Sequence, residues 1–462
     1  MLRIRQQDLP GLKVTIMGLG LHGGGLSSAV FFAERGAQVT VTDLRDRSTL
    51  KPSLEKLKPY TIGYTLGEHR EEDFTKSDLI IKNPAIPRNS PFLKAAAARG
   101  VPVETDLSIF LGLVANPIIA ITGSKGKSTA SSALHHTLLS AYPHARLGGN
   151  ITTSPLSFLP ELKPADPVVL ELSSWQLADL AGKGLLRPRI SMVTSILPDH
   201  QDRYDSMEDY VADKKLIFRE QGEKDYAIFN YQDPYQSPFA AQTRAKAFFF
   251  SDSPLPALTE GAFLERSAGW IRKKGKPEQL LDEELAIPGR HNRLNLLAAG
   301  LAASLFGLPA KKIRAALKGF PGIEHRLELF EHKKGLKFYN DSAATIPEAT
   351  AAALKSLKPP IILITGGTDK ELDFSTLMEV IHLADKIFLL AGSASEKMRK
   401  LFCKRGVAYA GPFDNLKETL IAAVAGSQPG SSILFSPACT SFGMFLNEFD
   451  RGRKFKALVA AL

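Results

Sequence analysis

The segment from residue 117 to residue 139 constrains the fold more than any other part of the chain. An apolar run, 117–121, leads into the loop Thr122–Thr129 (Thr-Gly-Ser-Lys-Gly-Lys-Ser-Thr), and a helical pattern follows over 127–139. In a strand–loop–helix unit of this kind, backbone N–H groups and the helix N-terminus face a phosphate group. The lysine reaches the terminal phosphates and the following hydroxyl holds Mg²⁺. The segment therefore predicts a nucleotide-binding α/β domain.

The loop is shorter than the common nucleotide-triphosphatase motif, which has a glycine where Ile121 stands. A glycine turn that carries solvent-exposed lysines is the alternative interpretation. The agreement of the loop, the Lys-Ser-Thr run and both flanking elements favours the phosphate site.

Bulk composition narrows the class of protein. A chain of 462 residues exceeds what one hydrophobic core supports, so we expect several domains. Two cysteines without metal-ligand spacing, no signal peptide and no long apolar run predict a cytoplasmic protein that does not enter a membrane. The net charge of +10 is spread along the chain without aromatic platforms, which argues against a nucleic-acid partner and is compatible with a polyanionic substrate. We further expect a monomer.

Alternating strand and helix patterns recur in three segments and predict an α/β fold of three domains, each with a largely parallel sheet. The expected domains are a Rossmann-like N-terminal domain (1–116), a central P-loop ATPase-like domain (117–322) and a Rossmann-like C-terminal domain (323–462). Within the central domain, residues 236–285 are weaker and more polar, which predicts a small antiparallel excursion.

The first segment carries a dinucleotide-binding pattern. A strand at 13–17 precedes the turn Gly18–Gly23 and a helix at 25–34, and a second strand, 38–43, ends in Asp43. This is the spacing of the βαβ fingerprint, in which the glycines approach a pyrophosphate and the acid takes a ribose hydroxyl. Taken alone, the pattern predicts a nicotinamide-dependent dehydrogenase.

Polar residues follow several strands of the central segment. Glu171 ends the strand 168–170, and His200 lies in a polar loop after the strand 191–196. Both suit a Mg²⁺ site at the carboxyl edge of a parallel sheet, although a helix-capping acid and a solvent-exposed histidine are the alternatives. Asn292 and Asn295 begin a helix, where they either bind a nucleoside or cap the helix. In the third segment, Asp341, Lys370 and Ser441 follow strand ends, and Arg326 could clamp a phosphate in a bidentate manner.

Together and in this order, these motifs resemble the Mur ligases, the ATP-dependent amide-forming enzymes of peptidoglycan precursor synthesis. The similarity covers almost the whole chain, at 122–129, 148–150, 171–176, 199–203, 214, 291–295, 325–326, 340–345 and 436–441. Within the family, the Asn-Asp-Ser and Ser-Pro-Ala motifs and the short N-terminal domain are similar to the branch that adds glutamate to UDP-N-acetylmuramoyl-L-alanine.

The resemblance implies that ATP phosphorylates the substrate carboxylate and that the amine of glutamate then attacks the acyl phosphate. It assigns catalysis to Lys127, His200, Lys214 and Glu171. It assigns two Mg²⁺ ions to Ser128, Thr129, Glu171, His200 and Lys214, the last as a carbamate.

Substrate binding is implied in the same way. ATP binding falls to Gly123, Ser124, Lys125, Gly126, Lys127, Ser128, Thr129, Asn292, Asn295, Arg326 and Asp341. UDP-sugar binding falls to Gly20, Leu21, His22, Asp43, Arg45, Asn83, Asn150, Ser173 and Gln176. Glutamate binding falls to Thr345, Lys370 and Ser441.

Two positions depart from the family pattern near the expected amino-acid pocket. Ala343 stands where the family often has lysine, and Glu448 stands where a phenylalanine is expected. Because a hydrogen bond to a charged group contributes about 1.5–3 kcal/mol, either another cation substitutes or affinity falls. The configuration of the glutamate, D or L, stays open on the sequence alone. A dehydrogenase and a nucleic-acid-stimulated ATPase are the alternatives from other functional classes.

Overall fold

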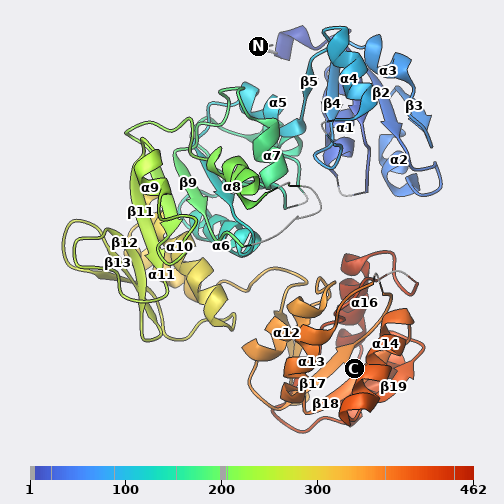
Figure 1. Cartoon of the computed structure of the whole chain (residues 1–462), viewed down its shortest axis with the longest axis vertical. Coiled ribbons are helices and arrows are strands. Elements are labelled where there is room, and N and C mark those ends of the chain that lie inside the picture. Colours follow the sequence, from blue (N-terminus) through green and yellow to red (C-terminus); the bar gives the residue numbers. More distant parts are fainter. Residues whose placement is uncertain are drawn as a thin grey trace. The chain divides into compact units, whose positions relative to one another are not determined.

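The computed structural model of the chain describes residues 6–21, 23–87, 89–151, 153–197, 204, 206–369, 371–441 and 443–462 (Figure 1). Within these residues the strands form three sheets, one in each third of the chain. The chain divides into two compact units, Met1–Glu283 with Leu294–Leu317, and Glu284–Arg293 with Lys318–Leu462. The predicted α/β class with three largely parallel sheets is confirmed.

The N-terminal sheet is parallel and has the strand order β3-β2-β1-β4-β5. Its strands are β1 (Lys13–Met17), β2 (Gln38–Asp43), β3 (Ile62–Leu66), β4 (Leu79–Lys82) and β5 (Val103–Glu104). Its helices are η1 (Gln6–Asp8), α1 (Gly24–Ala33), α2 (Lys51–Leu57), α3 (Glu71–Thr75), α4 (Pro91–Ala98) and α5 (Asp106–Leu113). The strand order reverses between β1 and β4, and a crevice forms at the carboxyl ends of strands at such a point.

The central sheet has the order β14-β13-β12-β11-β10-β9-β6-β8-β7. Its strands are β6 (Ile118–Thr122), β7 (Arg146–Gly149), β8 (Val168–Glu171), β9 (Ile190–Val193), β10 (Tyr226–Asn230), β11 (Lys246–Ser251), β12 (Gly261–Glu265), β13 (Ala268–Arg272) and β14 (Glu278–Leu281). Its helices are α6 (Lys127–Leu139), η2 (Pro155–Ser157), η3 (Leu159–Glu161), α7 (Ser174–Asp179), α8 (Met207–Lys215), α9 (Phe239–Gln242), α10 (Arg290–Phe306) and α11 (Ala310–Lys318).

The antiparallel excursion expected within 236–285 is smaller than predicted. Strands β12, β13 and β14 pair antiparallel, but β11 pairs parallel with both β10 and β12 and so extends the parallel sheet. The apolar run of β11, Lys-Ala-Phe-Phe-Phe-Ser, accounts for this, because a strand buried on both faces reads as a continuous apolar run.

The C-terminal sheet has the order β15-β16-β20-β17-β18-β19, with β15 antiparallel at one edge. Its strands are β15 (Glu328–Lys333), β16 (Leu336–Asn340), β17 (Ile361–Thr365), β18 (Lys386–Leu390), β19 (Ala410–Phe413) and β20 (Ser432–Phe435). Its helices are α12 (Pro347–Ser356), α13 (Ser375–Val380), η4 (Ile381–Leu383), α14 (Ser393–Arg405), α15 (Leu416–Ala425) and α16 (Glu448–Ala460).

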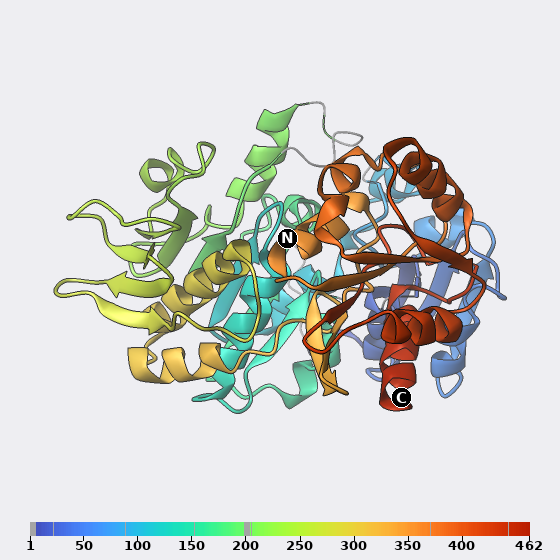
Figure 2. The same ribbon diagram turned by 90° about the horizontal axis from the view of Figure 1, so that it is seen from below.

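Helices cover both faces of the C-terminal sheet. Along β17, Leu363 packs into one hydrophobic core while Ile362 and Ile364 pack into another, as the two-residue repeat of a strand requires. Helix α16, the red helix that leads to the C-terminus in Figure 2, contributes to the second core, where Phe455 and Val459 are buried. Burial on both faces leaves the carboxyl ends of the strands as the edge where polar loops gather.

Candidate functional site

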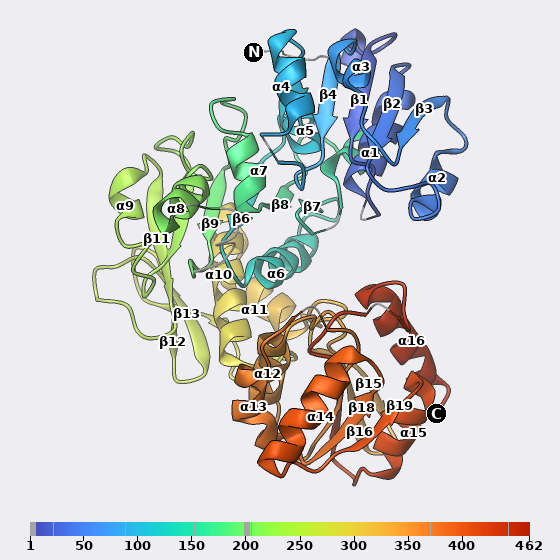
Figure 3. The same ribbon diagram turned by 45° about the vertical axis from the view of Figure 1, so that its right-hand side comes forward.

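The phosphate loop joins β6 to α6 at the carboxyl edge of the central sheet (Figure 3). Its glycines are required by the backbone, since Gly123 has φ 146° and Gly126 has φ 87°. The loop is held from the neighbouring strand, where Ser124 N–H donates to Ser195 O (2.6 Å). Lys127 is the first residue of α6, and its Nζ donates to Gly123 O (2.8 Å) and to Ser124 O (3.1 Å). The motif lysine therefore lies directly over the loop.

Replacing Gly123 with alanine is expected to destabilise the loop. An added Cβ would lie 2.0 Å from Thr194 Oγ1 and 3.0 Å from the backbone N and O of Ser195. With the φ strain, we expect the free energy of unfolding to fall by about 1–3 kcal/mol. Urea denaturation measures the change. Gly112→Ala in α5 is the matched control, because an added Cβ there meets no atom within 4 Å; equal stability of the two variants would contradict the account.

Glu171 is buried at the end of β8, beside the loop. Its carboxylate accepts hydrogen bonds from Asn150 Nδ2 (3.0 Å) and Ser131 Oγ (3.3 Å), the latter from helix α6. An added Cβ at Gly149 would lie 2.2 Å from Glu171 O, so the end of β7 approaches the end of β8 closely. Two predicted residues, Glu171 and Asn150, are thus linked through one buried carboxylate, together with Ser131, which was not predicted.

Lys214 lies in α8 and is also buried. Its Nζ is 4.4 Å from the centre of the Tyr210 ring, and Tyr210 Oη hydrogen-bonds Ser124 Oγ (2.9 Å) in the phosphate loop. Tyr210 therefore connects the predicted catalytic lysine to the loop. His200 lies outside the described residues.

A pocket of about 330 Å³ opens at the carboxyl edge of the N-terminal sheet. It contains five predicted residues, Gly20, Leu21, Asp43, Arg45 and Asn83. The Asp43 carboxylate accepts the backbone N–H groups of Gly20 (3.1 Å) and Arg45 (2.9 Å), so it ties the glycine turn to the loop after β2. His22 lies outside the described residues.

The remaining residues predicted to bind the UDP-sugar lie on the central domain. Ser173 and Gln176 form a capping box at the start of α7, in which Ser173 Oγ accepts the Gln176 N–H and the Gln176 side chain accepts the Ser173 N–H. Their hydrogen bonds therefore also fit a structural role at the helix start.

The second unit contains Asn292, Arg326 and Asp341. Asn292 Nδ2 donates to Pro288 O (2.7 Å), which supports a structural role at the start of the helix. Asn295 belongs to the first unit. It lies against the phosphate loop, because a Cβ added at Gly126 would come 2.4 Å from its Oδ1. Asp341 ends β16 and accepts Ser436 Oγ–H (2.6 Å) and Leu327 N–H (2.9 Å). Burial raises the pKa of Asp341 to about 7, against the lowering effect of these hydrogen bonds.

This pKa predicts a pH dependence of stability. The folded protein holds the Asp341 proton more tightly than the unfolded chain, whose value is 3.8. The resulting stabilisation is complete below about pH 4 and is lost as the pH rises through about 7. We expect the wild type to lose on the order of 1–4 kcal/mol more unfolding free energy between about pH 4 and pH 8 than Asp341→Asn. Urea denaturation across that range checks it; parallel curves would refute the assignment.

Two of the residues predicted to bind the substrate glutamate, Thr345 and Ser441, lie in loops after β16 and β20. The third, Lys370, lies outside the described residues. Arg451 of α16 joins these two loops, because its guanidinium donates to Ser342 O (2.6 Å) and Cys439 O (3.1 Å). Burial lowers the pKa of Arg451 to about 10. Glu448 begins α16, where an acid suits the helix dipole.

Sequence reasoning missed several residues around these sites. His69 lines the N-terminal pocket and its Nδ1 lies 2.6 Å from Thr42 Oγ1; Tyr210 and Arg451 make the contacts described above. Tyr210 and Arg451 occur in helices, where a pattern search for strand-end polar residues does not reach. A buried arginine among apolar helix positions was the available signal for Arg451.

Along the chain, a sheet with a phosphate loop follows one parallel sheet and precedes a second, largely parallel sheet, an order of domains shared by ATP-dependent ligases that form amide bonds. Three family models match successive parts of the chain: the Mur ligase MurD-like N-terminal domain (12–105), the Mur ligase middle domain (121–303) and the Mur ligase glutamate ligase domain (325–439). The chain belongs to the Mur ligase family.

Curated relatives match along nearly the whole chain. A protein of Treponema pallidum (strain Nichols) is 40% identical and one of Roseiflexus sp. (strain RS-1) is 39% identical; the alignments cover 98% of this chain and 98% and 99% of the relatives. Both relatives are named UDP-N-acetylmuramoylalanine--D-glutamate ligase.

Solved structures share the fold at low identity. UDP-N-acetylmuramate-alanine ligase MurC from Thermotoga maritima has a TM-score of 0.63 at 20% identity, over 97% of this chain and 99% of its own. MurF ligase from Thermotoga maritima, in complex with ADP, has a TM-score of 0.54 at 15% identity, over 99% of this chain and 97% of its own. Among the described residues, no helix has the length and apolarity to cross a membrane.

Proposed function

We propose that this chain joins D-glutamate to UDP-N-acetylmuramoyl-L-alanine, with cleavage of ATP to ADP and phosphate, in peptidoglycan precursor synthesis. The observation that carries the proposal is the full-length similarity to D-glutamate ligases, at 40% identity over 98% of both chains in the Treponema relative. The names of these relatives favour D- over L-glutamate. Models of one family span 12–439 in succession, which favours the ligase over a dehydrogenase or a nucleic-acid-stimulated ATPase.

In the first step, a carboxylate oxygen of the muramoyl-alanine substrate attacks the γ-phosphorus of ATP, and ADP leaves. The loop Gly123–Gly126 and the N-terminus of α6 receive the phosphates, and Lys127 neutralises charge on them. The amine of glutamate then attacks the acyl carbon, and the carbon–oxygen bond to phosphate breaks. Asn292, Asn295, Arg326 and Asp341 hold the nucleoside of ATP.

The residues at this edge fit magnesium. Glu171 is a buried carboxylate oriented by two hydrogen bonds, and Ser128 and Thr129 place hydroxyls in the first turn of α6. A carbamate on buried Lys214 would add an oxygen donor, and His200 would complete the set of residues that hold two ions. Oxygen ligands are what Mg²⁺ prefers, and the bound ion neutralises charge on phosphoryl oxygens.

The uridine diphosphate occupies the N-terminal pocket, with Gly20, Leu21, His22 and Asn83 toward the diphosphate and Asp43 and Arg45 toward the uracil. Asn150, Ser173 and Gln176 receive the sugar and its lactyl-alanine. Thr345, Lys370 and Ser441 bind the incoming glutamate.

We further propose that domain boundaries fall at 116/117 and 322/323. We also propose that the enzyme works as a monomer in the cytoplasm, where ATP and UDP-sugars are available.

A phosphate-release assay tests the proposal. We expect phosphate only when ATP, UDP-N-acetylmuramoyl-L-alanine and D-glutamate are all present, and much less with L-glutamate. Phosphate release stimulated by DNA or RNA without these substrates, or binding of NADH in place of the UDP-sugar, would contradict the proposal.

A further inference from the structure

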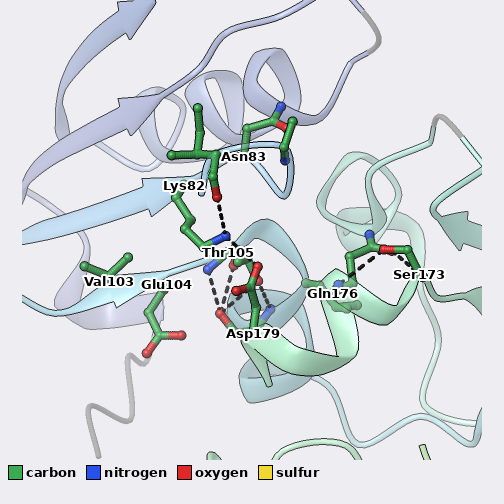
Figure 4. Close-up of polar contacts among 12 residues, drawn as sticks. Lys82, Asn83, Val103, Glu104, Thr105, Ser173, Gln176 and Asp179 are labelled. Atoms are coloured by element: carbon green, nitrogen blue, oxygen red, sulfur yellow. Dashed lines mark hydrogen bonds and ion pairs between the residues drawn. The ribbon is translucent and has the colours of Figure 1, made fainter. Parts of the chain in front are cut away.

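A buried ion pair joins the N-terminal domain to the central domain inside the first compact unit. Lys82, the last residue of β4, places its Nζ 2.6 Å from Asp179 Oδ2 at the end of α7 (Figure 4). The side chains are only 6% and 5% exposed. Burying two charges costs desolvation free energy, which a well-placed opposite charge offsets. Removing either side chain would therefore leave the other charge buried without this partner.

The same lysine holds the loop that follows β4. Its Nζ also approaches Ile86 O (3.4 Å), and Ile86 and Asn83 belong to the loop that lines the N-terminal pocket. Ile86 in addition lines a second cavity of about 580 Å³, which Lys82 and Asp179 border. The loop is therefore a wall between two cavities. Ile86 packs against the hydrophobic cluster around Met17 and Phe74, and the loop is fixed in addition by polar anchors, of which the Lys82 contact is one.

A second ion pair of opposite polarity lies next to the first. Lys183 Nζ, shortly after α7, contacts Glu104 Oε2 (2.8 Å) and Val103 O (3.2 Å) on β5, the strand that pairs with β4. The N-terminal domain thus presents a lysine and a glutamate, and the central domain presents an aspartate and a lysine. If α7 were displaced along β4 and β5 so that Lys183 met Lys82, or Asp179 met Glu104, like charges would repel each other. The two ion pairs therefore favour the observed alignment of α7 with these strands.

We propose that Lys82 and Asp179 are positioning residues for the nucleotide half of the substrate: the pair anchors the wall Asn83–Ile86 of the UDP pocket to helix α7 of the central domain. This inference rests on the proposed function only in taking UDP as the occupant of that pocket. The effect of both residues passes through the loop and through the helix that begins with the Ser173–Gln176 capping box.

Calorimetric titration of the full chain with UDP and, separately, with ATP tests the proposal. Lys82→Met and Asp179→Asn should each raise the Kd for UDP about tenfold, with the Kd for ATP unchanged within about twofold. In turnover assays the KM for the UDP-sugar should rise similarly while kcat stays near wild type. Lys76→Met is the matched control, because it removes an equally short but exposed pair with Glu72 (2.6 Å) in the same domain.

A double variant separates positioning from stability. Apolar replacement of a buried pair is often neutral or stabilising, so Lys82→Met with Asp179→Leu should recover the thermal stability that the single variants lose. The Kd for UDP should stay raised, because the Ile86 carbonyl still lacks its donor. Recovery of UDP affinity together with stability, or equal weakening of ATP and UDP, would overturn the inference. Failure of amide formation by the wild type would instead refute the proposed function, and UDP binding would still test the pair.

Discussion

Lys127→Ala is expected to lower kcat by about 10³-fold or more. The Lys127 ammonium lies over the phosphate loop, within hydrogen-bonding distance of the carbonyls of Gly123 and Ser124. Charge builds on the phosphoryl oxygens as the γ-phosphoryl group transfers, and a fixed cation stabilises that charge most strongly where water is excluded.

Single-turnover measurement of ADP formation checks this prediction, because it reports phosphoryl transfer without product release. Lys246→Ala is the matched control, since Lys246 is an exposed lysine on β11 of the same sheet. A variant at Lys127 that transferred phosphoryl groups at the wild-type rate would show that the motif lysine has no catalytic role.

Lys214→Ala should reduce amide formation by about 10²–10⁴-fold, and short carboxylic acids such as formate or acetate should restore part of it. Removing the side chain removes both the proposed carbamate and the contact with Tyr210, which hydrogen-bonds the phosphate loop. A small carboxylate can enter the space left by the side chain and return an anionic oxygen to the magnesium site.

Lys215→Ala separates this role from a general effect of charge on α8. Lys215 is the adjacent lysine, with its Nζ 5.4 Å from the centre of the Phe239 ring, away from Tyr210. Its variant should keep near-wild-type turnover and gain nothing from added acid. Full activity of Lys214→Ala in the absence of added acid would remove the carbamate from the mechanism.

Much of the fold was predictable because strand and helix periodicities are local. Helix α6 and strand β10 have the predicted limits, since a glycine turn or an apolar run marks their ends. The parallel pairing of β11 was missed, because pairing direction depends on partners distant in sequence. Strand β7, Arg-Leu-Gly-Gly, was also missed: its glycines read as a turn, yet they allow close approach to Glu171.

The candidate site was likewise predictable only in part. The βαβ pattern placed Gly20 and Asp43 in one unit and the family resemblance added Asn83; all three line one pocket, and their role in binding the UDP-sugar stays a prediction. It could not reveal Tyr210, Arg451 or the Lys82–Asp179 pair, whose roles come from contacts between elements far apart in the chain. Such side chains read as ordinary helix or strand residues until the tertiary structure brings partners to them.

The central claim is that a substrate carboxylate is activated as an acyl phosphate before the amide forms. The most direct test uses UDP-N-acetylmuramoyl-L-alanine whose carboxylate oxygens carry the heavy isotope of oxygen, followed by mass spectrometry of the released phosphate. The account predicts one heavy oxygen in each phosphate, because the carbon–oxygen bond breaks when glutamate attacks. Phosphate that contains no heavy oxygen, formed together with the amide product, would contradict it.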